Sequence, residues 1–125
     1  MATITGTASN DLLYGTDTTD TYKGLGGDDK FVWSKGNDSV YGGDGWDTMS
    51  YFHYTGNVTV TLNGESRGIA TGSLGDTKHL YSIEAVILGN GTDVATGDAG
   101  ANTFFGLRGD DRFVYSPGED LMYGD

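Results

Sequence analysis

An apolar residue recurs every nine positions in two stretches of the chain. These residues are Leu13, Tyr22, Phe31, Val40 and Met49 in the first stretch, and Ala95, Phe104, Phe113 and Met122 in the second. Successive side chains of a strand point to opposite faces, so a three-residue strand can bury a single central side chain. The pattern therefore predicts a series of very short strands, each with one residue directed inward, and an all-β fold.

Residues 51–87 separate the two stretches and do not follow the nine-residue period. Residues 58–62 alternate apolar and polar side chains, which is typical of a half-buried strand, and Asn63-Gly64 indicates a turn. We expect residues 68–75 to form a loop and residues 80–88 to form a strand, with a short amphipathic helix as the alternative for the latter. This insert is predicted to widen the sheet and to add apolar contacts.

An acid or its amide stands two residues before each periodic apolar residue. In frames of nine that begin at residues 6, 15, 24, 33 and 42, and again at 88, 97, 106 and 115, position six is Asp11, Asp20, Asp29, Asp38, Asp47, Asp93, Asn102, Asp111 and Asp120. Residues 24–43 and 106–125 also align at a constant offset of 82, with 12 of 20 residues identical. We expect one domain over residues 1–125, with repeat blocks at 6–50 and 88–125 around the insert at 51–87. A further frame opens at residue 124 and is not completed, so we expect a fragment of a longer array.

Composition restricts the classes of partner. The formal net charge is −11, and it comes from 15 Asp and only 3 Glu, while Gly contributes 22 residues and Cys none. Phosphate backbones are bound by Lys and Arg, so neither nucleic acid nor an anionic membrane surface is an expected partner. Without Cys there are no disulfides, which leaves a bound metal as the expected stabilising element. The first residues do not resemble a signal peptide, and no apolar run is long enough to span a membrane.

The stretch 42–50 matches the nonapeptide G-G-x-G-x-D-x-U-x at every fixed position, with U a large apolar residue. Glycine permits positive φ, so such a loop can turn several backbone carbonyls toward one point. Ca²⁺ takes six to eight oxygen ligands, and a loop of this kind that ends in one Asp supplies them largely from the main chain. The motif therefore predicts calcium binding.

With these residues the chain resembles a block of the RTX (repeats-in-toxin) haemolysin-type calcium-binding proteins. The resemblance covers about two-thirds of the chain, residues 6–50 and 88–125, and residues 76–86 are similar to the linker between repeat blocks of that family. It implies a right-handed parallel β-roll, a calcium-loaded β-solenoid in which two nonapeptides form one turn and ions lie in rows along both edges. Each ion would lie between one loop and the loop two frames later.

The resemblance also implies the ligands of about five Ca²⁺ ions. The first loop would give the carbonyls of positions two and four and the position-six side chain, and the second would give the carbonyls of positions one and three and its position-six side chain. The first site would use Thr7, Ser9 and Asp11 with Gly24, Gly26 and Asp29. The second would use Thr16, Thr18 and Asp20 with Trp33, Lys35 and Asp38, and the third Leu25, Gly27 and Asp29 with Gly42, Asp44 and Asp47. The fourth would use Gly89, Gly91 and Asp93 with Gly106, Arg108 and Asp111. The fifth would use Asp98, Gly100 and Asn102 with Tyr115, Pro117 and Asp120. The second and fifth sites depart most from the motif, at Thr18, Trp33, Asn102 and Tyr115.

The function that this implies is that of a non-enzymatic, calcium-binding structural module of a secreted protein. Export in an unfolded state through a type I channel would place the chain in extracellular calcium, where it would fold. Its partners would be calcium and the neighbouring repeats or domains of a longer chain. Neither nucleic-acid binding nor membrane insertion is expected.

Other functions remain open at this point. A carbohydrate-binding or adhesion module could use calcium or an aromatic run that consists of Trp33, Tyr41, Trp46, Tyr51, Phe52 and Tyr54. The two histidines, His53 and His79, could form a zinc or catalytic site or simply be exposed. Glu65, Glu84 and Glu119 could form a glycosidase pair only by coincidence. We find no Ser-His-Asp spacing, phosphate loop or EF-hand pattern.

Overall fold

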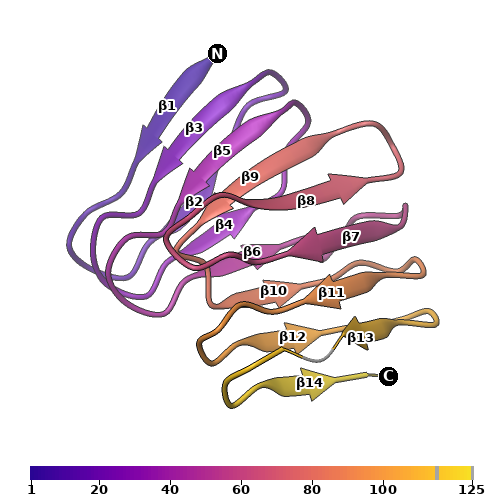
Figure 1. Ribbon diagram of the computed structural model, residues 1–125. Helices are drawn as coiled ribbons and strands as arrows, with labels where there is room; N and C mark the ends of the chain where they lie inside the picture. Colours follow the sequence, from indigo (N-terminus) through magenta and orange to yellow (C-terminus); the bar gives the residue numbers. More distant parts are fainter. Residues whose placement is uncertain (115, 125) are drawn as a thin grey trace.

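The computed structural model describes residues 1–114 and 116–124 and is built from short strands (Figure 1). The strands are β1 (Ala2–Thr5), β2 (Leu12–Tyr14), β3 (Asp20–Lys23), β4 (Lys30–Val32), β5 (Asp38–Tyr41), β6 (Thr48–Ser50), β7 (Val58–Thr61), β8 (Gly68–Gly72), β9 (Thr77–Tyr81), β10 (Ala85–Ile87), β11 (Val94–Thr96), β12 (Thr103–Phe105), β13 (Arg112–Val114) and β14 (Leu121–Tyr123). None of the described residues forms a helix, so the all-β prediction is confirmed and the helical alternative for residues 80–88 is wrong. The same part of the chain accordingly has no helix long and apolar enough to cross a membrane.

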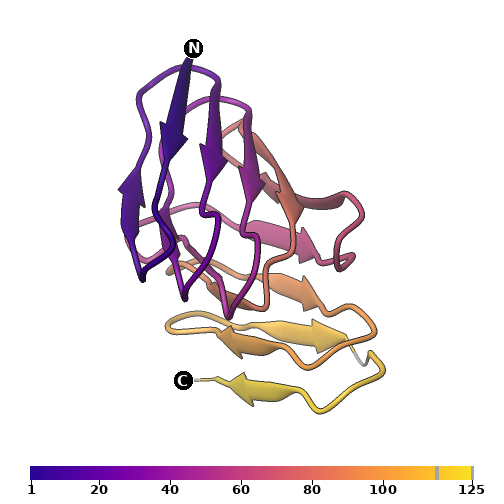
Figure 2. The same ribbon diagram turned by 90° about the vertical axis from the view of Figure 1, so that its left-hand side faces the viewer.

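Two sheets face each other, and within the repeat blocks the chain alternates between them. The eight-stranded sheet has the order β1-β3-β5-β9-β8-β7-β11-β13, and the six-stranded sheet has the order β14-β12-β10-β6-β4-β2. Within the repeat blocks, neighbouring strands are parallel and residues pair with residues 18 positions later, as Ala2 does with Asp20 and Leu12 with Lys30. Two nonapeptides therefore form one turn of a parallel β-roll. The turns stack from the N-terminus to the C-terminal end (Figures 1 and 2).

The core between the sheets consists largely of the periodic apolar residues. Position eight is buried in seven of the frames, at Leu13, Tyr22, Phe31, Val40, Met49, Ala95 and Phe104. Phe113 is only partly buried, and Met122, in the last described strand, keeps 38% of its surface exposed. The prediction of one inward side chain per strand is thus confirmed except at the C-terminal end.

The insert adds three strands to the eight-stranded sheet. Strands β7 and β8 form an antiparallel pair, β8 and β9 form another, and the three lie between β5 and β11. Apolar residues of the insert, Tyr51, Tyr54, Val58, Val60 and Leu80 among them, join the core. The predicted widening of the sheet, the strand that begins at Val58 and the turn at Asn63-Gly64 are confirmed.

Two predictions for the insert are wrong. Residues 68–75 are not a loop, because Gly68–Gly72 form β8 and pair on both sides. A side chain would not fit at Gly72 of this strand, because a Cβ there would collide with the Tyr54 hydroxyl. Residues 80–88 are not one strand either, because the chain leaves the eight-stranded sheet at Ser82, where φ is 53°, and enters the six-stranded sheet at β10.

Candidate metal centres in the loops

The loops between the sheets lie along two edges of the roll. We call the edge where the chain passes from the eight-stranded to the six-stranded sheet the first edge, and the opposite one the second edge. Position six ends each loop at the start of a strand: Asp29 lies directly before β4 at the first edge, whereas Asp38 opens β5 at the second. Consecutive loops therefore alternate between the edges, and loops two frames apart are stacked neighbours.

Hydrogen bonds join position-six residues of stacked loops, and we call this set of bonds the acid ladder. The backbone N–H of Asp11 donates to Asp29 Oδ1 at 2.8 Å, and that of Asp29 donates to Asp47 Oδ1 at 2.9 Å. The same bond joins Asp20 to Asp38, Asp93 to Asp111 and Asn102 to Asp120 at 2.7, 3.1 and 3.0 Å. These five pairs are the five loop pairs that the sequence predicts. The structure brings their side chains to the same junctions.

Backbone carbonyls also meet between stacked loops. Gly43 and Gly45 have φ of 96° and 113°, a region that side chains rarely adopt, and a Cβ at either would collide with the carbonyl oxygen of Leu25 or Gly27. Asp44 N–H also donates to the Leu25 carbonyl at 2.9 Å. Equivalent close approaches involve the carbonyls of Thr18, Gly91 and Gly100, with Gly36, Gly109 and Gly118 of the following loops. These carbonyls belong to positions two and four, which the resemblance assigns to the first loop of a calcium site.

Several carboxylate oxygens in these loops are buried without any partner. Oδ2 of Asp29, Asp47 and Asp111 is inaccessible to solvent and accepts no hydrogen bond. A buried polar atom that lacks a partner costs about 1–3 kcal/mol, and more if it is charged. A Cβ at Gly24 would collide both with Asp29 Oδ2 and with the Gly42 carbonyl oxygen, two ligands predicted for the third site. The donor set is all oxygen, so these loops fit a hard cation such as Ca²⁺.

Burial shifts the pKa of several position-six acids. Burial raises the pKa of Asp47 to about 6, and the nearby Glu84 and Asp29 carboxylates add to that shift. Burial also raises the pKa of Asp29, Asp93 and Asp111, each beside another carboxylate. Asp20 differs: burial acts to raise its pKa, but hydrogen bonds from the Thr16 N–H and hydroxyl outweigh it and the pKa is lowered. For Asp29, Asp47 and Asp111, whose Oδ2 atoms have no partner, the raised pKa reflects burial without a compensating positive charge.

The predicted sites are not equivalent. Threonine at position two satisfies the first carboxylate of the first two sites, since Thr7 and Thr16 donate N–H and hydroxyl bonds to Asp11 and Asp20. In the fifth site, Asn102 Oδ1 accepts the Asp98 N–H at 2.8 Å, and Asn102 Nδ2 is buried without an acceptor. Tyr115, a predicted carbonyl ligand of that site, lies outside the described residues. At Asn102 the fifth site thus has a neutral, hydrogen-bonded amide oxygen in place of a carboxylate.

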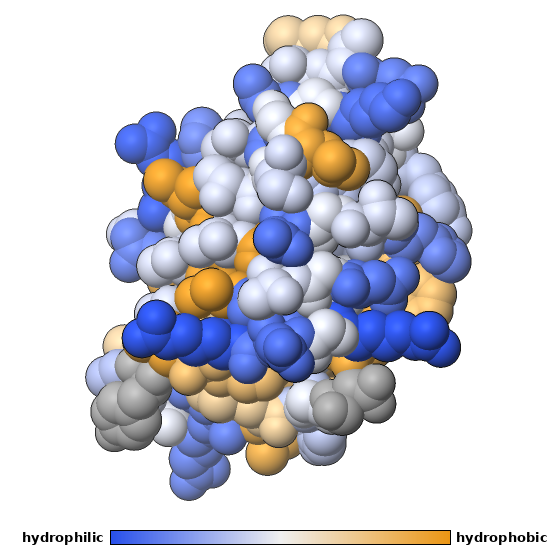
Figure 3. Space-filling view, turned by 90° about the vertical axis from the view of Figure 1, so that its right-hand side faces the viewer, coloured by the Kyte–Doolittle hydropathy of each residue, from blue (hydrophilic) through white to orange (hydrophobic). Residues whose placement is uncertain are grey.

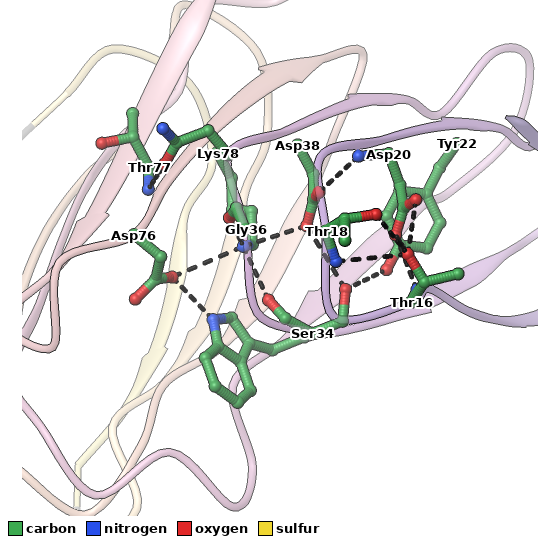
Figure 4. Close-up of polar contacts among 12 residues, drawn as sticks. Thr16, Thr18, Asp20, Tyr22, Ser34, Gly36, Asp38, Asp76, Thr77 and Lys78 are labelled. Carbon is green, nitrogen blue, oxygen red and sulfur yellow. Dashed lines mark hydrogen bonds and ion pairs between the residues drawn. The ribbon is translucent and has the colours of Figure 1, made fainter. Parts of the chain in front are cut away.

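Two residues of the insert continue the position-six series and were absent from the predicted ligands. Asp47 N–H donates to Glu84 Oε2 at 2.8 Å, so Glu84 takes the place of the next acid at the first edge. At the second edge Lys78 pairs in register with Asp38, and its ammonium lies 3.0 Å from Asp38 Oδ2 (Figure 4). A signal for Glu84 was present in the sequence, because it precedes the buried Val86 by two residues as every position-six acid precedes its apolar partner. No such signal identified Lys78.

The other candidate sites find less support. Among residues 1–114 and 116–124, no group of three or more His, Cys, Asp or Glu side chains could hold a metal by itself, so a metal here would depend on backbone carbonyls. The aromatic run is divided: Tyr51 and Tyr54 are buried, whereas Trp46 and Phe52 are exposed. Figure 3 shows apolar side chains scattered between polar ones on one face of the molecule. The aromatic run considered for saccharide binding therefore does not form one continuous exposed surface.

Comparison with known families identifies the repeats. A family model described as the RTX calcium-binding nonapeptide repeat (4 copies) matches residues 3–31, 34–51 and 87–125, which together make up more than half of the chain. Comparison with curated proteins found no match. The matched segments contain the loops of the acid ladder on both sides of the insert and leave out β7, β8 and β9. The chain therefore belongs to the RTX calcium-binding nonapeptide-repeat family.

Proposed function

We propose that this chain is a structural module that folds when Ca²⁺ binds between its stacked loops. The observation that carries the proposal is the set of buried, unpartnered Oδ2 atoms of Asp29, Asp47 and Asp111. Each belongs to a position-six acid whose Oδ1 is already fixed by the N–H of the preceding acid in the ladder. A cation beside Oδ2 would supply both the missing ligand bond and the missing charge.

We assign the ions to the loop pairs of the ladder. We keep the five predicted pairs as calcium sites, with Asp11, Asp20, Asp29, Asp93 and Asn102 as the first partners. The Asp47–Glu84 junction is a sixth: a Cβ at Gly42 would collide with the Ser82 carbonyl oxygen and lie 2.5 Å from Asp47 Oδ2. Gly24 is placed in the same way between Asp29 Oδ2 and the Gly42 carbonyl. Ser82 and Glu84 thus stand where the second loop of a calcium site would.

Calcium would decide folding because the metal-free chain buries like charges. A net charge of −11 is spread over loops that stack acid upon acid, and the apolar core has mostly one residue per strand. Metal sites that form only in the folded state contribute their binding free energy to folding. Sites of extracellular grade, with dissociation constants of about 10⁻⁴–10⁻³ M, would be empty at cytosolic calcium and filled outside.

We infer a secreted parent protein from this dependence and from the family. The chain would leave the cell unfolded, through a type I channel, and fold in millimolar calcium. Its role would be to stabilise and space neighbouring repeats or domains, not to catalyse a reaction. Its immediate partners would be calcium and those neighbouring segments.

The test combines calcium titration with a matched pair of variants. Far-UV circular dichroism should show little β signal with a chelator and a cooperative gain in millimolar Ca²⁺, while Mg²⁺, which prefers a tight octahedral shell, should substitute poorly. Asp29→Asn should shift the midpoint to higher calcium, whereas Asp17→Asn, which removes an exposed loop acid outside position six, should not. Equal β signal with and without calcium would refute the proposal.

A further inference from the structure

One cation is already present in the loops, and it belongs to the chain. The Lys78 side chain is fully buried, and its Nζ donates to the Ser34 carbonyl at 2.7 Å and to the Gly36 carbonyl at 2.6 Å. The same ammonium lies 3.0 Å from Asp38 Oδ2 and 3.5 Å from Asp76 Oδ2. Figure 4 shows the residues that supply these four oxygens, three in the loop of Asp38 and one, Asp76, in the insert.

Three of these oxygens are the set that a repeat loop offers to calcium. Ser34, Gly36 and Asp38 are positions two, four and six of the frame that begins at residue 33. In an uninterrupted array, the loop 18 residues later would close this site. Here the chain enters the insert instead, and β9 is the strand that pairs with β5.

The register shows that β9 takes the place of that next loop. The N–H of Thr77 donates to Asn37 Oδ1 at 3.0 Å, just as the N–H of Trp46 donates to Asp28 Oδ1 at 2.8 Å between two ordinary repeats. Asn37 and Asp28 both occupy position five, so Thr77 corresponds to position five and Lys78 to position six. A lysine thus stands where the closing acid of a calcium site would stand.

We propose that the Lys78 ammonium is a covalently attached substitute for Ca²⁺, and that it masks an additional divalent-cation site. The site consists of the carbonyls of Ser34 and Gly36 and the carboxylates of Asp38 and Asp76. The proposal rests on the calcium sites proposed above and extends them to a position that lacks the repeat motif.

Size and charge favour this exchange. The three oxygens nearest to Lys78 Nζ lie 2.6–3.0 Å from it. Because Ca²⁺ ligands lie at about 2.3–2.6 Å, these oxygens would need to move inward by about 0.4 Å to bind the ion. One ammonium leaves the two carboxylates with a net charge of −1, whereas Ca²⁺ would neutralise them. A surface pocket of about 520 Å³ lined by Trp33, Gly36 and Asp76 borders the site.

Hydrogen bonds from Trp33 and Tyr54 fix the position of the Asp76 carboxylate. Its Oδ2 accepts the Trp33 Nε1–H at 2.6 Å, and its Oδ1 accepts the Tyr54 hydroxyl at 2.9 Å. The Trp33 ring lies 5.6 Å from Lys78 Nζ, which adds a cation–π contact. The second carboxylate of the site therefore stays in place when the ammonium is removed.

The experiment compares calcium stoichiometry at saturation, by equilibrium dialysis with ⁴⁵Ca²⁺, in the wild type and in variants at Lys78. Lys78→Ala opens the site and should bind one more Ca²⁺ than the wild type, and its folding should depend more steeply on calcium. Lys78→Met removes the charge but fills the space, and should bind no extra ion. Lys30→Ala, which removes an exposed lysine and changes the net charge equally, should match the wild type. Adding Asp76→Asn to Lys78→Ala should weaken or abolish the extra ion.

Two outcomes would overturn the proposal. One is a folded Lys78→Ala variant with the stoichiometry of the wild type, and the other is a Lys78→Ala variant that no calcium concentration can fold. Both differ from failure of the proposed function, in which the wild type itself would bind no calcium.

Discussion

The backbone N–H of Asp47 donates to Glu84 Oε2 at 2.8 Å across 37 residues of sequence. Between ordinary repeats the same bond joins acids only 18 residues apart, as from Asp29 to Asp47. Strand β10, the last strand of the insert, pairs in parallel register with β6, Ala85 with Thr48, and with β12, so it joins the two blocks in the six-stranded sheet. The acid ladder of the first edge therefore extends from the first block to Glu84 of the insert.

This relationship predicts a specific loss in Glu84→Gln. The amide keeps an oxygen for the Asp47 N–H but removes the charge beside the unpartnered Asp47 Oδ2, so one Ca²⁺ should be lost or bound about tenfold more weakly. Calcium titration by isothermal calorimetry measures this. Glu65→Gln, at an exposed acid of the insert, is the control and should match the wild type. Identical titrations for both variants would remove Glu84 from the calcium ligands.

The acids of the repeats should rank as Asp29, then Asp111, then Asp120 in importance. Asp29 joins Asp11 to Asp47 in the ladder, and so serves two predicted sites, whereas Asp120 serves only the site that Asn102 weakens. Asp29→Ala should raise the calcium midpoint of folding by about tenfold or more, because a hydrogen bond to a charged group contributes about 1.5–3 kcal/mol. Asp120→Ala should change it little. Tryptophan fluorescence of Trp33 and Trp46 follows the titrations, and the reverse order would show that the loop pairing is wrong.

Calcium binding should weaken as the pH falls through about 6. Burial raises the pKa of Asp47 in the folded chain to about 6. Protonation of Asp47 therefore stabilises the folded chain when no calcium is bound. This stabilisation is complete below the ordinary pKa of Asp and is lost as the pH rises through 6. Calcium requires the carboxylate, so protons compete with it at low pH. At pH 5 a site with this pKa should bind about tenfold more weakly than at pH 7.5. Calorimetry in two buffers at pH 6 should also show proton release, and a midpoint independent of pH would contradict the assignment.

Alanine variants at two glycines with positive φ, Gly45 and Gly64, separate the cost of backbone strain from the cost of a collision with the stacked loop. Gly45 has φ of 113° and a Cβ there would collide with the Gly27 carbonyl, whereas Gly64 has φ of 61° and no atom within 4 Å of an added Cβ. Both alanine variants should lose about 1 kcal/mol from the backbone alone. Gly45→Ala should lose more and should raise the calcium midpoint, because the Gly27 carbonyl is a predicted ligand. Equal denaturation midpoints for the two variants in saturating calcium would show that this close approach does not matter.

The period of nine predicted the repeat strands and their inward residues, because a short strand with one buried side chain leaves a regular trace in the sequence. The pairing of Asp29 with Asp47 followed from the family resemblance, and the register of 18 agrees with it. In contrast, β8 could not be predicted. Gly68 and Gly72 resemble loop residues, and they become strand only because β7 and β9 flank them.

Lys78 shows a different limit of sequence analysis. It stands outside the motif, 40 residues after the acid with which it pairs, and that distance depends on how the insert folds. A lysine in an alternating strand is normally exposed, whereas this one is fully buried because the loop of Asp38 supplies two carbonyls and a carboxylate. Only the three-dimensional register reveals its position.

The two sheets have eight and six strands, so they differ in how closely they connect the two repeat blocks and thus in how they can couple the folding of one block to that of the other. Repeat proteins fold as one-dimensional arrays in which each unit is stabilised by its neighbours. In the six-stranded sheet a single strand of the insert, β10, lies between β6 and β12, whereas in the eight-stranded sheet β7, β8 and β9 lie between β5 and β11. Order gained by one block would therefore reach the other through one insert strand on the six-stranded side and through three on the eight-stranded side, so the insert would couple the two folding units unequally.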